Sequence, residues 1–123
     1  MNFMKKTLMI TLLTCGSTSI FAACNENMNQ MELNFCSMDE YRKADRELNQ
    51  VYTAYMSKLD AARKQQVKAV QQNWIKYKES DCTYVASAYE GGSIQPLIEN
   101  SCLTEKTKLR TKELKEYLKE ENR

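Results

Sequence analysis

The sequence contains no histidine, one proline and three glycines in 123 residues. Without histidine the chain has no Ser-His or Cys-His nucleophile pair and no imidazole metal ligand, which excludes most familiar hydrolases. Because proline and glycine are the usual interruptions of a helix, their scarcity predicts an all-α chain. Pro96 and the adjacent Gly91 and Gly92 mark the places where helices are expected to begin or end.

Long apolar runs are also scarce, and the one that is present lies at the start of the chain. Lys5 and Lys6 precede an apolar stretch over residues 7–21. This order is typical of a secretory signal peptide, and the stretch is too short to span a bilayer of about 30 Å comfortably. We therefore predict a signal peptide over residues 1–22, a single mature domain over residues 23–123, and a periplasmic or secreted location with no membrane span.

A second interpretation of the leader is a lipoprotein signal. Phe21-Ala22-Ala23-Cys24 resembles a lipobox, which would make Cys24 an acylated N-terminus. Phe21 fits that motif poorly, since leucine is usual there, and Cys24 has a ready role in a disulfide. We therefore favour release of the mature chain over anchoring.

The predicted mature chain has no excess of charge. Removing Lys5 and Lys6 from the 18 basic residues leaves 16, against 16 acidic residues. Nucleic-acid binders use a strong positive field, so no nucleic-acid partner is expected.

The periodicity of apolar residues predicts an antiparallel three-helix bundle with a short N-terminal appendage over residues 24–36. Ser37 and Glu40 resemble an N-cap and its capping-box glutamate, so the first helix is expected to start at Ser37. Its apolar positions are Tyr41, Ala44, Leu48, Val51, Tyr52, Tyr55 and Leu59.

The second and third helices are expected to meet at the paired glycines. The second ends at Glu90 with Gly91 as its C-cap, and Ser93 caps the third, with Pro96 in the first turn. The core positions expected on the second helix are Val67, Val70, Trp74, Tyr77, Val85 and Ala88, and those on the third are Leu97, Ile98, Cys102, Leu109, Leu114, Tyr117 and Leu118. Arg110 and Thr107 are expected to fix this hairpin by hydrogen bonds, since a buried arginine needs a partner.

Four cysteines remain in the predicted mature chain, which suggests two disulfides in an exported protein. Cys82 and Cys102 lie about ten residues on either side of the glycine turn, at matching heights if both arms are helical. Cys24 and Cys36 would close the appendage locally. Four cysteines allow three pairings, of which we favour this one, and their wide spacing disfavours a zinc site.

Other candidate sites give weaker signals. Glu79 with Asp81, or Asp39 with Glu40, are the acid pairs available for hydrolysis, but residues one or two apart do not share a helix face. The aromatic residues Trp74 and Tyr77 are a candidate binding face for a sugar or peptide, with core packing as the alternative. No metal or cofactor is expected.

Several blocks resemble one known family along the mature chain. They include Met31–Cys36, Tyr41–Asn49, Gln72–Tyr77, Asp81-Cys82, Tyr89–Ser93, Pro96, Cys102, Thr107 and Arg110–Leu114. In their order and spacing these blocks resemble the LprI-like lysozyme-inhibitor family, formerly a domain of unknown function. The resemblance implies a non-catalytic binding protein whose partner is a lysozyme or another envelope protein.

If the chain inhibits a lysozyme, the loop of Glu90, Gly91, Gly92 and Ser93 is the natural plug for the active-site cleft, and the alternative is that the loop is a plain helix-turn-helix cap with no binding role. C-type lysozymes are basic, so an inhibitor benefits from an acidic face, yet only the region from Glu26 to Glu47 is acid-rich in the sequence. The alternative function is a cell-envelope interaction module that binds another protein or a cell-wall fragment without inhibiting lysozyme.

Overall fold

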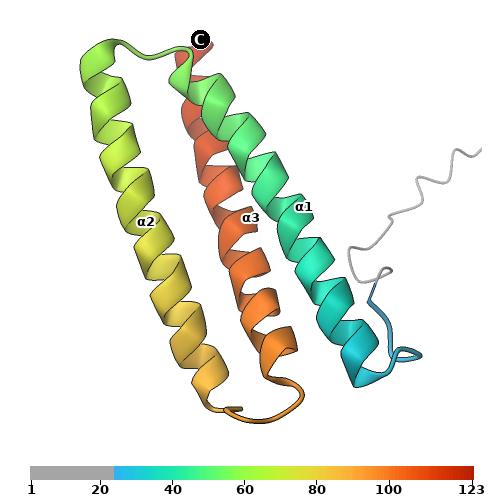
Figure 1. Ribbon diagram of the computed structural model, residues 1–123. Coiled ribbons are helices and arrows are strands. Elements are labelled where there is room, and N and C mark those ends of the chain that lie inside the picture. The colour runs from blue at the N-terminus through green and yellow to red at the C-terminus, as the bar shows by residue number, and fades with distance from the viewer. Residues whose placement is uncertain (1–23) are drawn as a thin grey trace, which may run out of the picture.

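A computed structural model describes residues 24–123, so the predicted signal peptide over residues 1–22 lies outside the described residues. The described chain folds into three helices, α1 (Gln30–Met56), α2 (Ala61–Ser87) and α3 (Gln95–Glu121), with no strand among these residues (Figure 1). Each helix has 27 residues, which corresponds to a length of about 40 Å. The all-α, three-helix prediction is confirmed.

Helix α1 begins earlier than the sequence suggested. Asn29 is its N-cap, and Asn29 and Glu32 form a reciprocal capping box, so the helix starts at Gln30 rather than at Ser37. Ser37 is buried inside the helix, where its hydroxyl donates a hydrogen bond to the Asn34 carbonyl. The appendage is therefore shorter than predicted and covers residues 24–29. Both Asn29 and Ser37 are followed by a glutamate three residues later, and the capping box forms at Asn29.

The turn between α2 and α3 also differs from the prediction at both ends. Helix α2 ends at Ser87, three residues before Glu90, and α3 has Ile94 as its N-cap without any side-chain cap from Ser93. Gly91 does adopt a positive φ of 75°, which glycine tolerates best. Pro96 lies in the first turn of α3 as predicted, where its missing N–H costs little.

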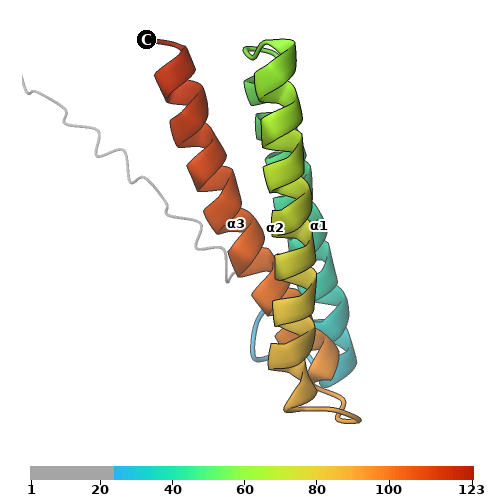
Figure 2. The same ribbon diagram turned by 90° about the vertical axis from the view of Figure 1, so that its left-hand side faces the viewer.

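Successive helices run in opposite directions, so α1 and α3 are parallel to each other (Figure 1). Figure 2, viewed from the α2 side, shows α1 behind α2, and α3 to one side of both and leaning away from them toward its C-terminus. Helix α3 packs against both neighbours, more extensively against α1, whereas α1 and α2 approach each other only sparsely. The arrangement leaves an open groove between α1 and α2.

The apolar core is concentrated near the turn between α1 and α2. Its buried members are Leu48, Tyr55, Leu59 and Leu114, with Val67, Trp74 and Leu118 among the half-buried residues packed against them. Toward the other end the buried positions are small or polar, and they include Cys82, Ala86, Thr104 and Thr107.

The predicted core positions of α1 are confirmed, but those of α2 and α3 are partly wrong. Val70, Tyr77, Val85, Ala88, Leu109 and Tyr117 are exposed, and the inward positions of α2 are Gln71, Lys78, Cys82 and Ala86. Two of these inward side chains are polar, so an apolar pattern could not identify this face.

Both predicted disulfides are present. Cys24 pairs with Cys36, with Cα atoms 5.7 Å apart, and Cys82 pairs with Cys102 at a Cα distance of 5.5 Å. The first fixes residues 24–29 to α1, and the second joins α2 to α3 through the fully buried Cys82. Covalent links of this kind stabilise a domain of this size, whose core is small.

Polar contacts join the helices where apolar packing is thin. Arg110 is buried and donates from Nε to Gln71 Oε1 of α2 at 2.9 Å, which confirms its predicted role in the hairpin. Thr107 instead donates to the Leu103 carbonyl of its own helix. Asn100 donates to the Ser37 hydroxyl and so links α3 to α1. Searching the described helices for a stretch long and apolar enough to cross a membrane finds none.

Candidate binding sites

The turn that carries Glu90, Gly91, Gly92 and Ser93 lies at one end of the bundle, and all four residues are exposed (Figure 1). Gly92 N donates to the Tyr89 carbonyl at 2.9 Å, and Asn34 of α1 donates from Nδ2 to the Ser93 carbonyl at 2.9 Å. A Cβ on Gly92 would meet the Tyr89 carbonyl oxygen at 3.1 Å. The turn is therefore held in one conformation by its own backbone and by α1.

Acidic residues gather at the same end. Residues 24–41 and 79–105 contain no lysine or arginine, whereas all 16 basic residues of the described chain lie in the remaining segments. We call these two segments the acidic end. It carries nine carboxylates: Glu26, Glu32, Asp39, Glu40, Glu79, Asp81, Glu90, Glu99 and Glu105.

Three of the nine carboxylates are held in ion pairs at the border with the basic segments. Asp39 pairs with Arg42, Glu40 with Lys43, and Asp81 with Lys106 at 2.8 Å. The hydrogen bond with Asp81 raises the pKa of Lys106 against the lowering effect of burial. The Glu79–Asp81 and Asp39–Glu40 pairs considered for hydrolysis thus each contain at least one carboxylate that is engaged structurally.

Large apolar side chains are exposed among these carboxylates. Met31 and Phe35 lie on the first turns of α1, and Tyr84, Val85 and Tyr89 lie on the last turns of α2 and just beyond it. Tyr84 is 76% exposed, the largest value among the exposed apolar residues. Apolar anchors surrounded by charge are typical of protein-binding surfaces.

The predicted aromatic face is not one face. Trp74 is half-buried in the groove between α1 and α2, together with Tyr41 and Tyr52. Tyr77 points elsewhere and is exposed, with Lys106 Nζ 4.7 Å from the centre of its ring. A ligand that contacts Trp74 in this groove would therefore not be recognised by Tyr77.

The groove around Trp74, which we call the α1–α2 cleft, has a volume of about 460 Å³. Its most unusual member is Lys78, which is only 3% exposed. The ammonium group donates to the Tyr41 hydroxyl at 2.8 Å and lies 4.9 Å from the centre of the Trp74 ring. Sequence analysis missed Lys78, because nothing in the local pattern distinguishes it from the exposed Lys76.

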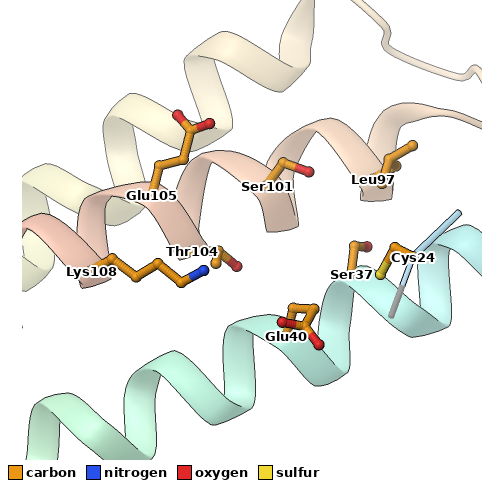
Figure 3. Close-up of a pocket in the computed structure, with 8 residues that line it drawn as sticks. All are labelled: Cys24, Ser37, Glu40, Leu97, Ser101, Thr104, Glu105 and Lys108. Atoms are coloured by element: carbon orange, nitrogen blue, oxygen red, sulfur yellow. The ribbon is translucent and has the colours of Figure 1, made fainter. Parts of the chain in front are cut away.

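A second, smaller cleft of about 310 Å³ lies between α1 and α3. Figure 3 shows that it opens beside Cys24, with Glu40 and Ser37 on one wall and Leu97, Thr104 and Lys108 on the other. Its Glu40 carboxylate is already paired with Lys43. Among the residues described, no group of three cysteine or carboxylate side chains is placed to hold a metal ion.

The sequence analysis found only part of the acidic end, within the acid-rich region from Glu26 to Glu47, although the signal of the second segment is also visible in the sequence. The 27 residues between Lys78 and Lys106 contain five acids and no base, and residues 24–41 contain four acids and no base. The two segments are far apart in the chain, so only the helix arrangement shows that they meet.

Comparisons with known proteins agree with the resemblance noted in the sequence. A profile of the family described as "Lysozyme inhibitor LprI" matches residues 22–114. An uncharacterised protein of Rhizobium meliloti (strain 1021) is 33% identical over 108 residues, covering 77% of this chain and 78% of the relative. No solved structure matches the chain significantly.

Proposed function

The chain belongs to the LprI lysozyme inhibitor family, and from that premise we propose that it is an exported, non-catalytic protein that binds and inhibits a lysozyme. The two disulfides support a location outside the cytoplasm, in the periplasm or beyond the cell, since such bonds persist in oxidising compartments. The Cys24–Cys36 bond uses the sulfur atom that a thioether-linked lipid would need, which supports release rather than anchoring at Cys24.

The observation that carries this proposal is the acidic end with its exposed apolar side chains. C-type lysozymes are basic, so an end with nine carboxylates, only three of which are held in ion pairs, would attract them and speed the encounter. Tyr84 and Tyr89 then provide apolar contact area, which tyrosine supplies at many interfaces. The mature chain is neutral overall, but the rate at which it meets a basic lysozyme depends on the charge of the end that docks.

The glycine turn is the part of this end best suited to enter a cleft. Gly91 and Gly92 have no side chains, so their backbone can approach a partner closely. The hydrogen bond from Asn34 to the Ser93 carbonyl already fixes the turn, which reduces the entropy lost on binding. Lysozymes cleave with two carboxylates in an open cleft, and a rigid turn lying over that cleft would exclude the substrate.

The test is a cell-wall lysis assay with a basic C-type lysozyme and increasing amounts of the oxidised mature protein. Stoichiometric loss of lysis that weakens as salt is added supports inhibition by an electrostatically steered complex. Undiminished lysis at a large molar excess, with the protein shown to be folded and oxidised, would contradict the proposal.

A second candidate function is a cell-envelope interaction module that binds a protein or a cell-wall fragment. The α1–α2 cleft favours it, because Trp74 and the buried Lys78 lie in a groove on a different part of the bundle from the glycine turn. Inhibition of lysozyme would use the acidic end, and the second function would use the α1–α2 cleft, so the two can be tested separately.

A further inference from the structure

The α1–α2 cleft has the size and composition of a site for a small ligand. Its volume of about 460 Å³ falls in the range of roughly 300–1,000 Å³ found for small-molecule sites. Aromatic walls come from Tyr41 and Tyr52 of α1 and Trp74 of α2, and exposed amide groups come from Asn49 and Gln72. Such a mixture suits a ligand with an apolar face and polar edges.

The ammonium group of Lys78 has few direct polar partners among the side chains around it. Its ammonium group has three N–H donors and makes one hydrogen bond, to the Tyr41 hydroxyl. The other close groups are the rings of Trp74 and Tyr41, whose centres lie 4.9 and 5.2 Å away. In the described chain no carboxylate pairs with Lys78, although burial of a charge is costly without a partner.

The rest of the cleft indicates which anion would complete this site. The lining carries two carboxylates, Asp45 and Glu79, against two ammonium groups, Lys68 and Lys78, so the cleft lacks the excess of positive charge that a polyanion such as a nucleic acid needs and favours a single carboxylate. The amide and carboxylate groups would leave a lipid tail in contact with polar atoms, which disfavours a fatty acid. A pyranose ring, with hydroxyl edges and a C–H face, matches both the amides and the aromatic walls.

We propose that the α1–α2 cleft binds a saccharide that carries one carboxylate, with Lys78 as the residue that recognises the carboxylate. The proposal specifies the ligand class for the second candidate function and rests on that function, but it does not require lysozyme inhibition. Trp74 is the single tryptophan of the sequence, so its fluorescence reports on this cleft alone.

The experiment compares N-acetylmuramic acid and glucuronic acid, which have a carboxylate, with N-acetylglucosamine, which lacks one. Titration of the oxidised mature protein should give a saturable change in Trp74 fluorescence, with a matching calorimetric affinity, for an acid sugar but not for N-acetylglucosamine. Preference for either acid sugar supports the proposal, and the tighter-binding one of the two shows which kind of acid sugar the cleft recognises. Equal responses to all three sugars, or no saturable response, would overturn it.

A matched pair of variants tests the role of Lys78. Lys78→Met keeps the side-chain volume and should weaken acid-sugar binding by about 30-fold or more. Lys106→Met removes the other lysine that lies over a tyrosine ring and should leave affinity unchanged, because Lys106 is outside the cleft. Circular dichroism of the helices checks that each variant is folded. If Lys78→Met does not fold, the test uses Lys78→Arg, which keeps the positive charge and should retain acid-sugar binding. Retained affinity in a folded Lys78→Met, or a complete loss in a folded Lys78→Arg, would contradict the proposal.

Inhibition of lysozyme is measured on the same variants so that the two proposals can fail independently. Lys78→Met should inhibit as well as the parent protein, since Lys78 lies in the cleft and the glycine turn lies at the end of the bundle.

Discussion

Arg63, in the first turn of α2, donates a hydrogen bond to Glu121, in the last turn of α3. The two residues are 58 positions apart, and their ion pair joins the helices at the end of the bundle opposite the glycine turn. The Cys82–Cys102 bond fastens the same two helices nearer the glycine turn. Helices α2 and α3 are therefore joined near both ends, covalently at one and electrostatically at the other.

This ion pair predicts a pH dependence of stability. The hydrogen bond from Arg63 lowers the pKa of Glu121 below its ordinary value of 4.5. Because the folded-state pKa is the lower one, the stabilisation is present above about pH 4.5 and is lost as the pH falls through the folded-state pKa. Glu121→Gln should lower the urea midpoint at pH 7, and its difference from the parent should vanish once the pH falls below the folded-state pKa of Glu121. Glu116→Gln, an exposed control on α3, should show no such convergence.

Removal of the buried disulfide should be costly. For the 20-residue separation of Cys82 and Cys102, chain entropy gives a stabilisation of about 3 kcal/mol. The double variant Cys82→Ala/Cys102→Ala should lose roughly that amount in urea denaturation. A loss below about 1 kcal/mol would mean that the hydrogen bonds of Arg110 suffice to hold α2 against α3.

The state of the cysteines is tested by thiol titration. The mature parent protein should show no free thiol in its native form and four free thiols after denaturation and reduction.

Charge at the acidic end should control the rate of lysozyme binding. Glu90→Gln/Glu99→Gln removes two carboxylates from that end and should slow association several-fold at low salt, with a smaller effect at high salt. Neither side chain makes an ion pair in the described structure, so the fold should be unaffected. Glu116→Gln, which removes one carboxylate at the opposite end of the bundle, is the control, and the effects are compared per carboxylate removed. If both variants slow association equally per carboxylate removed, net charge controls the association rate and the position of the charge at the acidic end does not.

Tyr84 should be a major contact if the acidic end docks. Tyr84→Ala removes an exposed side chain and should reduce inhibition about tenfold, because exposed tyrosines at interface centres often contribute more than 1 kcal/mol. Leu109→Ala is the control, since Leu109 is 63% exposed and lies on α3 outside the acidic segments. If both variants inhibit like the parent protein, the docking surface lies elsewhere.

Two adjacent glutamines should differ sharply in their effect on folding. Gln71 is buried and accepts the Arg110 Nε hydrogen bond, whereas Gln72 is exposed. Gln71→Ala should destabilise the protein by about 2 kcal/mol, because it leaves a buried N–H donor of Arg110 without its acceptor. Gln72→Ala should change stability by less than about 0.5 kcal/mol. Urea denaturation of both variants measures the difference.

The same glutamine shows why the sequence predicted α1 better than α2. The inward positions of α1 that form the core, such as Ala44, Leu48 and Tyr55, are apolar or aromatic and recur at helical spacing. Helix α2 turns Gln71 and Lys78 inward, and their partners are on α3 and α1 respectively. Those partners are known only once the helices are packed, so an apolar pattern assigns Val70 and Tyr77 to the core instead.

The candidate sites show the same division between local and distant information. The glycine turn and both disulfides were predicted, because paired glycines and matched cysteine spacing are local signals. The acidic end requires residues 24–41 and 79–105 to meet, and the α1–α2 cleft requires Tyr41 to reach Lys78. Both depend on the up-down-up course of the chain.

The separation of charge between the two ends gives the bundle an electric dipole along its long axis. The described chain has equal numbers of acidic and basic side chains, so near neutral pH it should hardly migrate in an electric field. Its acidic end can nevertheless adsorb to an anion exchanger in dilute buffer, and the remaining segments, which carry all 16 basic residues of the described chain, can adsorb to a cation exchanger. Although its net charge is close to zero, the protein can therefore be retained by both anion and cation exchangers, and it would face the two resins with opposite ends.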